Sequence, residues 1–289
     1  MVHSIYKSDY GRKRIQTHYE NYLDLLPFKV EREYIPTRFG NTHVLLAGPK
    51  SSEPIFVLQG GNCVNPITLS WFHTLAQTYR IYAPDTVGHP GFSEEKRISA
   101  VDNSFALWIE DLLQHYQIEK ARFVGPSYGA GIILRLATYT PEKIISAALV
   151  APAGIRLGSK RDMIKKILIP MFRYRWFSSS KALENLTDHM SKGTMKQINR
   201  QIIGDIFKYV KLEQEMPKLT ERSELVNYTS PTVVITGTED VFFPDLIVKP
   251  AATEIISNLQ NSTYEMGHFP SEENLQKINE ELRTFFANN

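Results

Sequence analysis

The chain has 289 residues, a formal net charge of +2, 42% hydrophobic residues and 22% charged residues. This length and composition are typical of one globular α/β domain with room for a small insertion. The near-neutral charge and the lack of a basic, aromatic ribbon argue against a nucleic-acid-binding protein. Cys63 is the single cysteine, so no disulfide can form within the chain, as is typical of proteins in a reducing compartment.

The first 26 residues are studded with charged side chains and contain no apolar run of signal-peptide length. No run of eighteen apolar residues occurs anywhere in the sequence. We therefore expect a cytoplasmic protein without stable insertion into a membrane. Residues 4–26 predict an outer helix, whose tyrosine rings pack against the body of the protein.

Short apolar runs alternate with helical patterns from residue 29 onward. Strand patterns cover residues 29–36, 42–47, 54–58, 80–84, 121–124 and 144–150, and helical patterns cover residues 67–79, 101–117 and the run after residue 127. This alternation predicts a mostly parallel sheet with right-handed crossovers and helices on both faces.

The alternation lapses between residues 155 and 227, which are helical, basic and aromatic in pattern. It then resumes with a strand at 232–236, a helix at 247–259, a strand at 262–266 and a closing helix at 272–286. We therefore predict a helical cap over residues 155–227, inserted into a core formed by residues 1–154 and 228–289. In open α/β sheets ligands bind beyond the carboxyl ends of the strands, where such a cap would lie.

The clearest motif is the Gly-Pro-Ser-Tyr-Gly run of residues 125–129, set between an apolar strand and a helical run. This is the context of a nucleophile elbow, in which a serine is held on a strained strand-to-helix turn. Side chains at Gly125 and Gly129 would collide in such a turn, so glycine is needed at both positions. The motif predicts Ser127 as a nucleophile.

A serine nucleophile needs a base that accepts its proton, and in this kind of fold the base follows the serine in the chain. Of the eight histidines, His189 and His268 follow Ser127. His189 lies in the predicted cap and is expected on the surface. His268 comes directly after the last strand pattern, where a loop can hold its imidazole over the serine.

The acid of a triad should follow the preceding strand, which ends near residue 236. Asp240 is the predicted acid, with Glu239 and Asp245 as its competitors. The oxyanion of an acyl-transfer intermediate needs two N–H donors. We predict the backbone N–H groups of Tyr128, the residue after the nucleophile, and of Gly61, with Asn62 as the next candidate.

With these residues in place, the chain resembles the α/β-hydrolase superfamily over nearly its whole length, and in particular bacterial carboxylesterases of the naproxen-esterase type. The resemblance rests on residues 37–43, the loop from Gly60 and residues 82–85, the elbow at Ser127, and residues 237–241 and 267–268. It implies a serine hydrolase acting on small-molecule carboxylic esters without a cofactor or metal, with the helical block as a lid. One departure is Gln59-Gly60, where the family usually has His-Gly; the Gln59 side chain can still hold the loop by hydrogen bonds.

Several other activities are compatible with the same residues. A thioesterase, lactonase, amidase, perhydrolase or C–C bond hydrolase would use the same triad, and a ligand sensor would keep it while turning over slowly. Cys63 has no base beside it in sequence, which favours a buried apolar role over a nucleophilic one. The basic, aromatic stretch 160–176 resembles a membrane-surface helix, but Pro170 is expected to interrupt it, which argues against a lipase.

Overall fold

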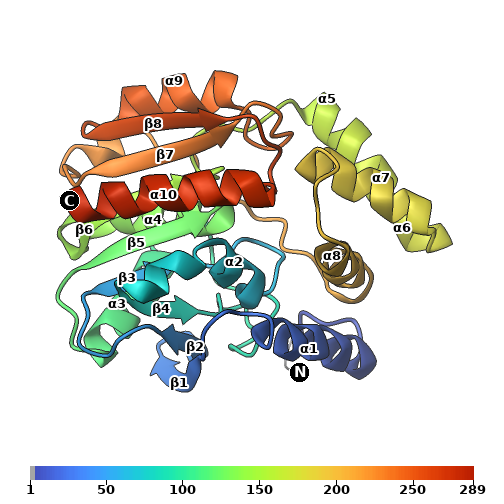
Figure 1. Ribbon diagram of the computed structural model, residues 1–289, viewed down its shortest axis with the longest axis horizontal. Helices are drawn as coiled ribbons and strands as arrows, with labels where there is room; N and C mark the ends of the chain where they lie inside the picture. The colour runs from blue at the N-terminus through green and yellow to red at the C-terminus, as the bar shows by residue number, and fades with distance from the viewer. Residues whose placement is uncertain (1–3) are drawn as a thin grey trace.

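One eight-stranded sheet forms the centre of the protein, for which a computed structural model describes residues 4–289 (Figure 1). The strands are β1 (Glu31–Thr37), β2 (Gly40–Ala47), β3 (Pro54–Val57), β4 (Arg80–Pro84), β5 (Ala121–Pro126), β6 (Ile144–Val150), β7 (Thr232–Gly237) and β8 (Leu259–Tyr264). Their order is β1-β2-β4-β3-β5-β6-β7-β8; β2 is antiparallel to both its neighbours and the remaining pairs are parallel. The predicted mostly parallel sheet is confirmed.

Helices cover both faces of this sheet. The helices that pack on the sheet are α2 (Asn65–Trp71), α3 (Ser104–His115), α4 (Tyr128–Tyr139), α9 (Asp245–Ile255) and α10 (Glu272–Asn288). The other helices are α1 (Asp9–Leu23), α5 (Lys160–Asp162), α6 (Ile169–Phe177), α7 (Ser180–Ser191) and α8 (Gln197–Tyr209). Successive strand residues face opposite sides. Ile55 and Val57 of β3 therefore share a core with α2 and α10, whereas Phe56 shares the other core with α3, α4 and α9.

The segment 155–227 lies between β6 and β7 in the chain, and none of the eight strands falls within it. Its helices α5 to α8 stand beyond one end of the sheet, as Figure 1 shows. The N-terminal segment reaches this group as well: Tyr6 forms a β-bridge with Val210, and Arg14 of α1 pairs with Asp205 of α8 at 2.7 Å. Residues 4–23 therefore tie the helical segment to the body.

Two predicted element boundaries are wrong. The helical pattern 67–79 is divided into α2 and a 3-10 turn at His73–Gln77, separated at Phe72. The pattern 247–259 ends as a helix at Ile255, and β8 begins at Leu259 so that all six residues pair with β7 from Thr232 to Gly237. This edge strand is only partly buried and its sequence is polar, which explains why its start carries a weak apolar signal.

The expected interruption at Pro170 is also wrong. Residues 160–177 form one continuous helical run, in which a π-helical turn at Met163–Leu168 joins α5 to α6. Proline lacks an N–H and clashes with the carbonyl four residues earlier in an α-helix. The wider turn directly precedes Pro170, with the N–H of Ile169 donated to the carbonyl of Ile164, five residues back, so that the helix continues through the proline.

Candidate active site

Ser127 lies on a strained turn between β5 and α4. Its backbone has φ 52° and ψ −116°, a conformation that non-glycine residues rarely adopt and that costs about 1–3 kcal/mol. A Cβ on Gly125 would lie 2.7 Å from the backbone carbon of Gly129, and a Cβ on Gly129 would lie 2.4 Å from the carbonyl oxygen of Leu58. Gly125 is thus needed for the steric reason inferred from the motif, whereas Gly129 is needed because the chain after β3 passes close to it.

His268 and Asp240 are held together in the loops that follow β8 and β7. Nδ1 of His268 lies 2.8 Å from Oδ2 of Asp240, whose side chain is fully buried. The other carboxylate oxygen, Oδ1, accepts the backbone N–H groups of Phe242 and Phe243 at 2.8 and 3.1 Å. Because a carboxylate oxygen accepts, Nδ1 is the nitrogen that carries the proton, and Nε2 of His268 keeps its lone pair.

The competing candidates lie elsewhere. Glu239 forms an ion pair with Lys192 at 2.6 Å, and Asp245 lies in the first turn of α9. His189 is exposed on α7, as expected from its place in the helical segment. Of the three acidic candidates, Asp240 is the one that contacts His268.

Ser127, His268, Gly61 and Tyr128 line one cavity with a volume of about 1070 Å³. A Cβ on Gly61 would come 2.9 Å from Cβ of Tyr128, so the loop after β3 and the start of α4 approach closely. The N–H of Gly60 is donated to Oγ1 of Thr68, and that of Asn62 to Nδ1 of His89. The N–H of Gly61 lies between these two engaged donors.

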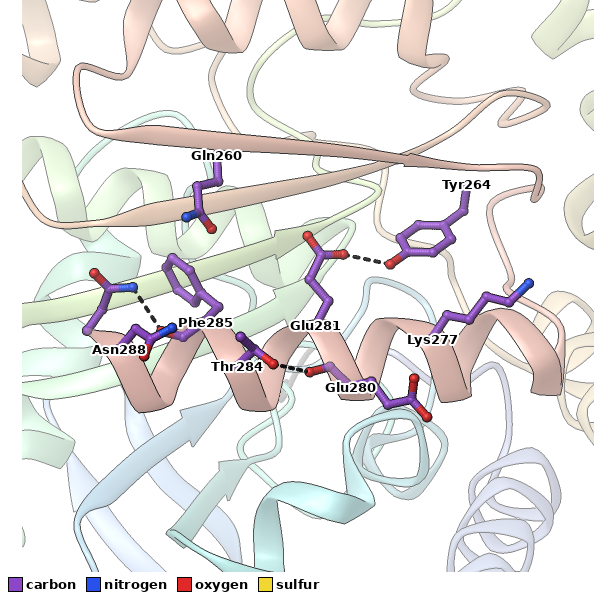
Figure 2. Close-up of a pocket in the computed structure, with 9 residues that line it drawn as sticks. Gln260, Tyr264, Lys277, Glu280, Glu281, Thr284, Phe285 and Asn288 are labelled. Carbon is purple, nitrogen blue, oxygen red and sulfur yellow. Dashed lines mark hydrogen bonds between the residues drawn. The ribbon is translucent and has the colours of Figure 1, made fainter.

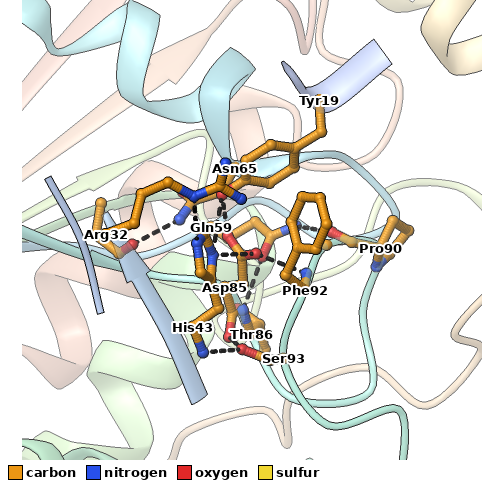
Figure 3. A network of polar contacts seen from close by, with 12 residues as sticks. Tyr19, Arg32, His43, Gln59, Asn65, Asp85, Thr86, Pro90, Phe92 and Ser93 are labelled. Carbon is orange, nitrogen blue, oxygen red and sulfur yellow. Dashed lines mark hydrogen bonds and ion pairs between the residues drawn. The ribbon is translucent and has the colours of Figure 1, made fainter. Parts of the chain in front are cut away.

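Gln59 holds the loop that leads to Gly61. Its side chain is fully buried: Nε2 donates to the carbonyls of Cys63 and Pro90 at 2.6 and 2.9 Å, and Oε1 accepts from the N–H of Thr86 at 2.7 Å. Three backbone groups are thereby satisfied by one amide (Figure 3). The Gln59 side chain therefore holds this loop by hydrogen bonds, as the sequence suggested.

A second His–Asp pair lies in the same polar network (Figure 3). Nδ1 of His43 contacts Oδ2 of Asp85 at 2.9 Å, while its Nε2 accepts from Nε of Arg32 at 2.9 Å. Tyr19 donates its hydroxyl to the other oxygen of Asp85 at 2.7 Å. Both nitrogens of His43 are engaged and the ring is fully buried, so this pair joins α1, β1, β2 and the loop after β4 rather than facing substrate.

His89 supports the site and was missed by the sequence analysis. Its ring is fully buried 4.6 Å from that of Tyr128, and its Nδ1 accepts the N–H of Asn62 at 3.3 Å. The signal available in the sequence was its place in the Gly- and Pro-rich loop 88–91. Burial, reinforced by the charge of Arg97, lowers the pKa of His89 from 6.5 to about 3.

The depressed pKa of His89 makes stability depend on pH. Below about pH 6.5, His89 is protonated in the unfolded chain but not in the folded protein. The free energy of unfolding therefore falls by about 1.4 kcal/mol for each unit by which the pH is lowered. Between about pH 7 and about pH 5, we expect the free energy of unfolding to fall by about 2 kcal/mol less in His89→Asn than in the wild type. Asparagine keeps an acceptor for the N–H of Asn62. Urea unfolding at the two pH values measures it, with His189→Gln as control; equal losses in both variants would contradict the assignment.

Glu213 is a second residue without a local sequence signal. The side chain of Asn62 donates to the Glu213 carbonyl at 3.0 Å and accepts the Glu213 N–H at 2.7 Å. The Glu213 carboxylate pairs with Arg97 at 2.9 Å. These hydrogen bonds form a latch between the loop that carries Gly61 and the segment that follows α8.

Most of the cavity wall is apolar. Residues from the helical segment contribute Met163, Ile164, Ile167, Leu168, Met171, Phe172, Met190, Ile203 and Phe207, and the body contributes Ile67, Trp71, Phe242, Phe243 and Phe269. Trp176 and Phe177 at the end of α6 lie outside the lining and are 84% and 72% exposed. Cys63 lines the cavity, but burial raises the pKa of its thiol to about 12, so no thiolate forms near neutral pH.

A separate hollow of about 530 Å³ runs between α10 and the edge strand β8 (Figure 2). Its wall is polar, and Glu281 accepts the hydroxyl hydrogen of Tyr264 at 2.7 Å. Among the described residues that line it there is no serine, cysteine or histidine. The chemistry-bearing residues therefore converge on the cavity at Ser127 and not on this hollow.

Within residues 4–289 no group of three or more His, Cys, Asp or Glu side chains is arranged to hold a metal ion. Over the same residues, no helix is both long enough and apolar enough to span a bilayer.

Comparison with known proteins identifies the family of this chain. Residues 54–275 match the family described as alpha/beta hydrolase fold, and the chain belongs to that family. It is 27% identical over 294 residues to the uncharacterized carboxylesterase nap of Bacillus subtilis (strain 168), covering 96% of this chain and 94% of that protein.

Solved structures with the same fold include two esterases. Naproxen esterase (carboxylesterase NP) from Bacillus subtilis superposes with a TM-score of 0.84 at 23% identity, over 96% of this chain and 99% of its own. Carboxylesterase CesB (YbfK) from the same species gives a TM-score of 0.81 at 20% identity, over 97% of this chain and 99% of its own. The fold and family inferred from the motifs are confirmed.

Proposed function

We propose that this protein is a serine carboxylesterase in which Ser127, His268 and Asp240 form the catalytic triad. The observation that carries the proposal is the strained Ser127 in the same cavity as His268, whose Nδ1 is bound by Asp240 at 2.8 Å. The similarity over almost full length to proteins named carboxylesterases supports an ester as the substrate.

Each residue of the triad has a distinct role in this reaction. Oγ of Ser127 attacks the ester carbonyl carbon while Nε2 of His268 accepts its proton. The resulting imidazolium is stabilised by Asp240, and Nε2 then protonates the departing alcohol to leave an acyl-enzyme. Water, activated by the same Nε2, attacks the acyl carbon, and Ser127 regains its proton as the carboxylic acid leaves.

The negative charge on the carbonyl oxygen of the intermediate needs donors already in position. We assign this role to the N–H groups of Gly61 and Tyr128. The N–H groups of Gly60 and Asn62 are engaged elsewhere, which favours Gly61. Tyr128 is the first residue of α4, where an N–H is free of intrahelical bonding and the helix dipole favours negative charge.

The cap and the core divide the work in this proposal. Residues 155–227 act as a substrate-selecting cap, and residues 1–154 and 228–289 carry the chemistry. The apolar wall supports esters with an apolar acyl or alcohol group. The buried, protonated Cys63 as the single cysteine supports a reducing, cytoplasmic setting.

A substrate panel tests the proposal against its rivals. Purified protein is assayed with p-nitrophenyl esters, thioesters and lactones, and its serines are labelled with a fluorophosphonate. We expect rapid multiple turnover of activated esters and covalent labelling of Ser127. Preferred turnover of thioesters or lactones would change the substrate class, and labelling without turnover would favour a ligand sensor.

Phe172→Ala tests whether the cap selects acyl-chain length. Phe172 lines the cavity yet is half exposed, so its loss should alter substrate contacts with little effect on Tm. We expect kcat/KM for a medium-chain ester relative to acetate to fall about tenfold, since removing pocket contacts is worth about 1–3 kcal/mol. Phe177→Ala, outside the lining, is the matched control, and an unchanged ranking in Phe172→Ala would refute the selecting role.

A further inference from the structure

The helical run 160–177 exposes an unusual amount of apolar surface. Of the seventeen exposed large hydrophobic side chains among residues 4–289, six belong to these eighteen residues: Ile164, Leu168, Ile169, Phe172, Trp176 and Phe177. Its inner side is buried through Ile167, Met171 and Tyr174. Of the six, Ile169, Trp176 and Phe177 lie outside the lining of the Ser127 cavity, so these three are surplus both to helix packing and to the cavity wall. A gathered apolar patch of this kind marks an interaction surface.

Four of these residues form a continuous stripe. Ile164, Leu168, Phe172 and Trp176 recur every four residues, which sets them as neighbours along one face of the helix. The first three also line the cavity at Ser127, whereas Trp176 lies beyond it. The stripe thus runs from the open surface into the wall of the cavity.

The same helix is strongly basic. Residues 160–177 contain six basic residues and one acidic residue, although the whole chain carries a formal charge of only +2. No carboxylate of residues 4–289 forms an ion pair with any of the six, which are Lys160, Arg161, Lys165, Lys166, Arg173 and Arg175. Lys160 and Arg175 also line the cavity at Ser127, whereas the other four are exposed outside that lining. The charge that these four residues can meet therefore lies outside the chain.

We propose that the helix 160–177 lies flat on an anionic lipid surface, with its apolar stripe among the acyl chains and its basic residues at the headgroups. Interfacial helices combine these features: an apolar face with tryptophan and phenylalanine, and lysine and arginine beside it. Each basic residue near an anionic surface contributes attraction that salt screens. An ester drawn from the lipid would pass along the stripe into the cavity at Ser127.

A second copy of this chain is a poorer occupant for the same surface. A two-fold dimer joins the same patch on both subunits. Each subunit would present six basic residues and one aspartate to the same set on its partner. Like charges that face each other oppose association. Charge complementarity therefore favours the anionic lipid over self-association.

We test this inference by measuring how the 289-residue chain binds lipid vesicles, an assay that reports binding and not turnover. Sedimentation with vesicles of phosphatidylcholine and phosphatidylglycerol in equal parts is compared with vesicles of phosphatidylcholine alone. We expect binding to the anionic vesicles that weakens with salt. Trp71 and Trp108 are buried, so a blue shift of tryptophan fluorescence on binding reports the exposed Trp176.

Two variants and their controls locate the contact. We expect Lys165→Glu/Lys166→Glu to lower the partition coefficient by about tenfold or more, and Trp176→Ala to lower it by about fivefold. Lys120→Glu/Lys143→Glu makes the same charge change where β5 and β6 begin, and Leu246→Ala removes a side chain that is 81% exposed on α9. Both control variants should bind as the wild type does.

Three outcomes would overturn the inference. Wild-type protein that fails to bind anionic vesicles at low salt has no such surface. Equal losses in Lys165→Glu/Lys166→Glu and its control would assign binding to net charge and not to this helix. A dimer in sedimentation equilibrium that Trp176→Ala dissociates, without vesicle binding, would assign the stripe to self-association. Hydrolysis of soluble esters is measured separately, so failure of one proposal is distinguishable from failure of the other.

Discussion

We expect Ser127→Ala to lower kcat/KM for a short-chain p-nitrophenyl ester by about four orders of magnitude or more. In the proposed mechanism the variant loses covalent catalysis through Oγ, while the cavity and the proposed donors at Gly61 and Tyr128 remain. Alanine has the same backbone demands as serine at φ 52°, so Tm should change little. Steady-state kinetics and thermal unfolding of the purified variant measure both quantities.

Covalent labelling supplies the complementary control for this variant. A fluorophosphonate should modify wild-type protein at Ser127 and leave Ser127→Ala unmodified, as judged by mass spectrometry of the digested protein. Retained turnover in the alanine variant, or labelling at another serine of the wild type, would contradict the role of Ser127 as nucleophile.

Asp240→Asn should lower kcat by about three to four orders of magnitude. An asparagine can turn an NH₂ group toward Nδ1 of His268, which forces the ring proton onto Nε2 and removes the lone pair needed to accept the serine proton. The asparagine oxygen can still accept the N–H groups of Phe242 and Phe243, so the loop should keep its shape. Kinetics on a p-nitrophenyl ester, with circular dichroism to confirm folding, measure the effect.

The two neighbouring carboxylates provide matched controls for Asp240. Glu239→Gln removes an ion pair with Lys192 at the surface, and Asp245→Asn removes a charge from the first turn of α9. Each should lower kcat less than tenfold, because exposed ion pairs and helix-dipole charges are worth about 1 kcal/mol or less. If either control costs more activity than Asp240→Asn, the acid has been assigned to the wrong residue.

The parts of the site that the sequence predicted are those set by local geometry. A Cβ on Gly125 would clash with Gly129 inside the five-residue turn, so the need for this glycine is visible in the motif itself, whereas Gly129 is also required by the approach of Leu58. Asp240 and His268 each follow a strand, and the carboxyl ends of parallel strands meet at one edge. A linear pattern is therefore enough to bring these two residues toward Ser127.

The parts that could not be predicted depend on contacts between distant segments. Asn62 and Glu213 are 151 residues apart, and no sequence motif that contains one of them predicts its contact with the other. The low pKa of His89 arises from burial, which a sequence does not display. The helix through Pro170 depends on a π-helical turn, whereas propensity alone assigns a break. The first two features are set by tertiary structure, and the third is a local change of helix type that propensity does not encode.

The latch between Asn62 and Glu213 has a consequence for exchanging parts between relatives. The proposed cap is contiguous in sequence, so residues 155–227 could be transplanted as one segment to transfer substrate specificity. Its boundaries in space are wider, because residues 4–23 run along α8 and Asn62 reaches into the returning chain. A chimera should therefore transfer three parts together: residues 155–227, the N-terminal residues 4–23 that contact α8, and the residue at position 62 that bonds to Glu213.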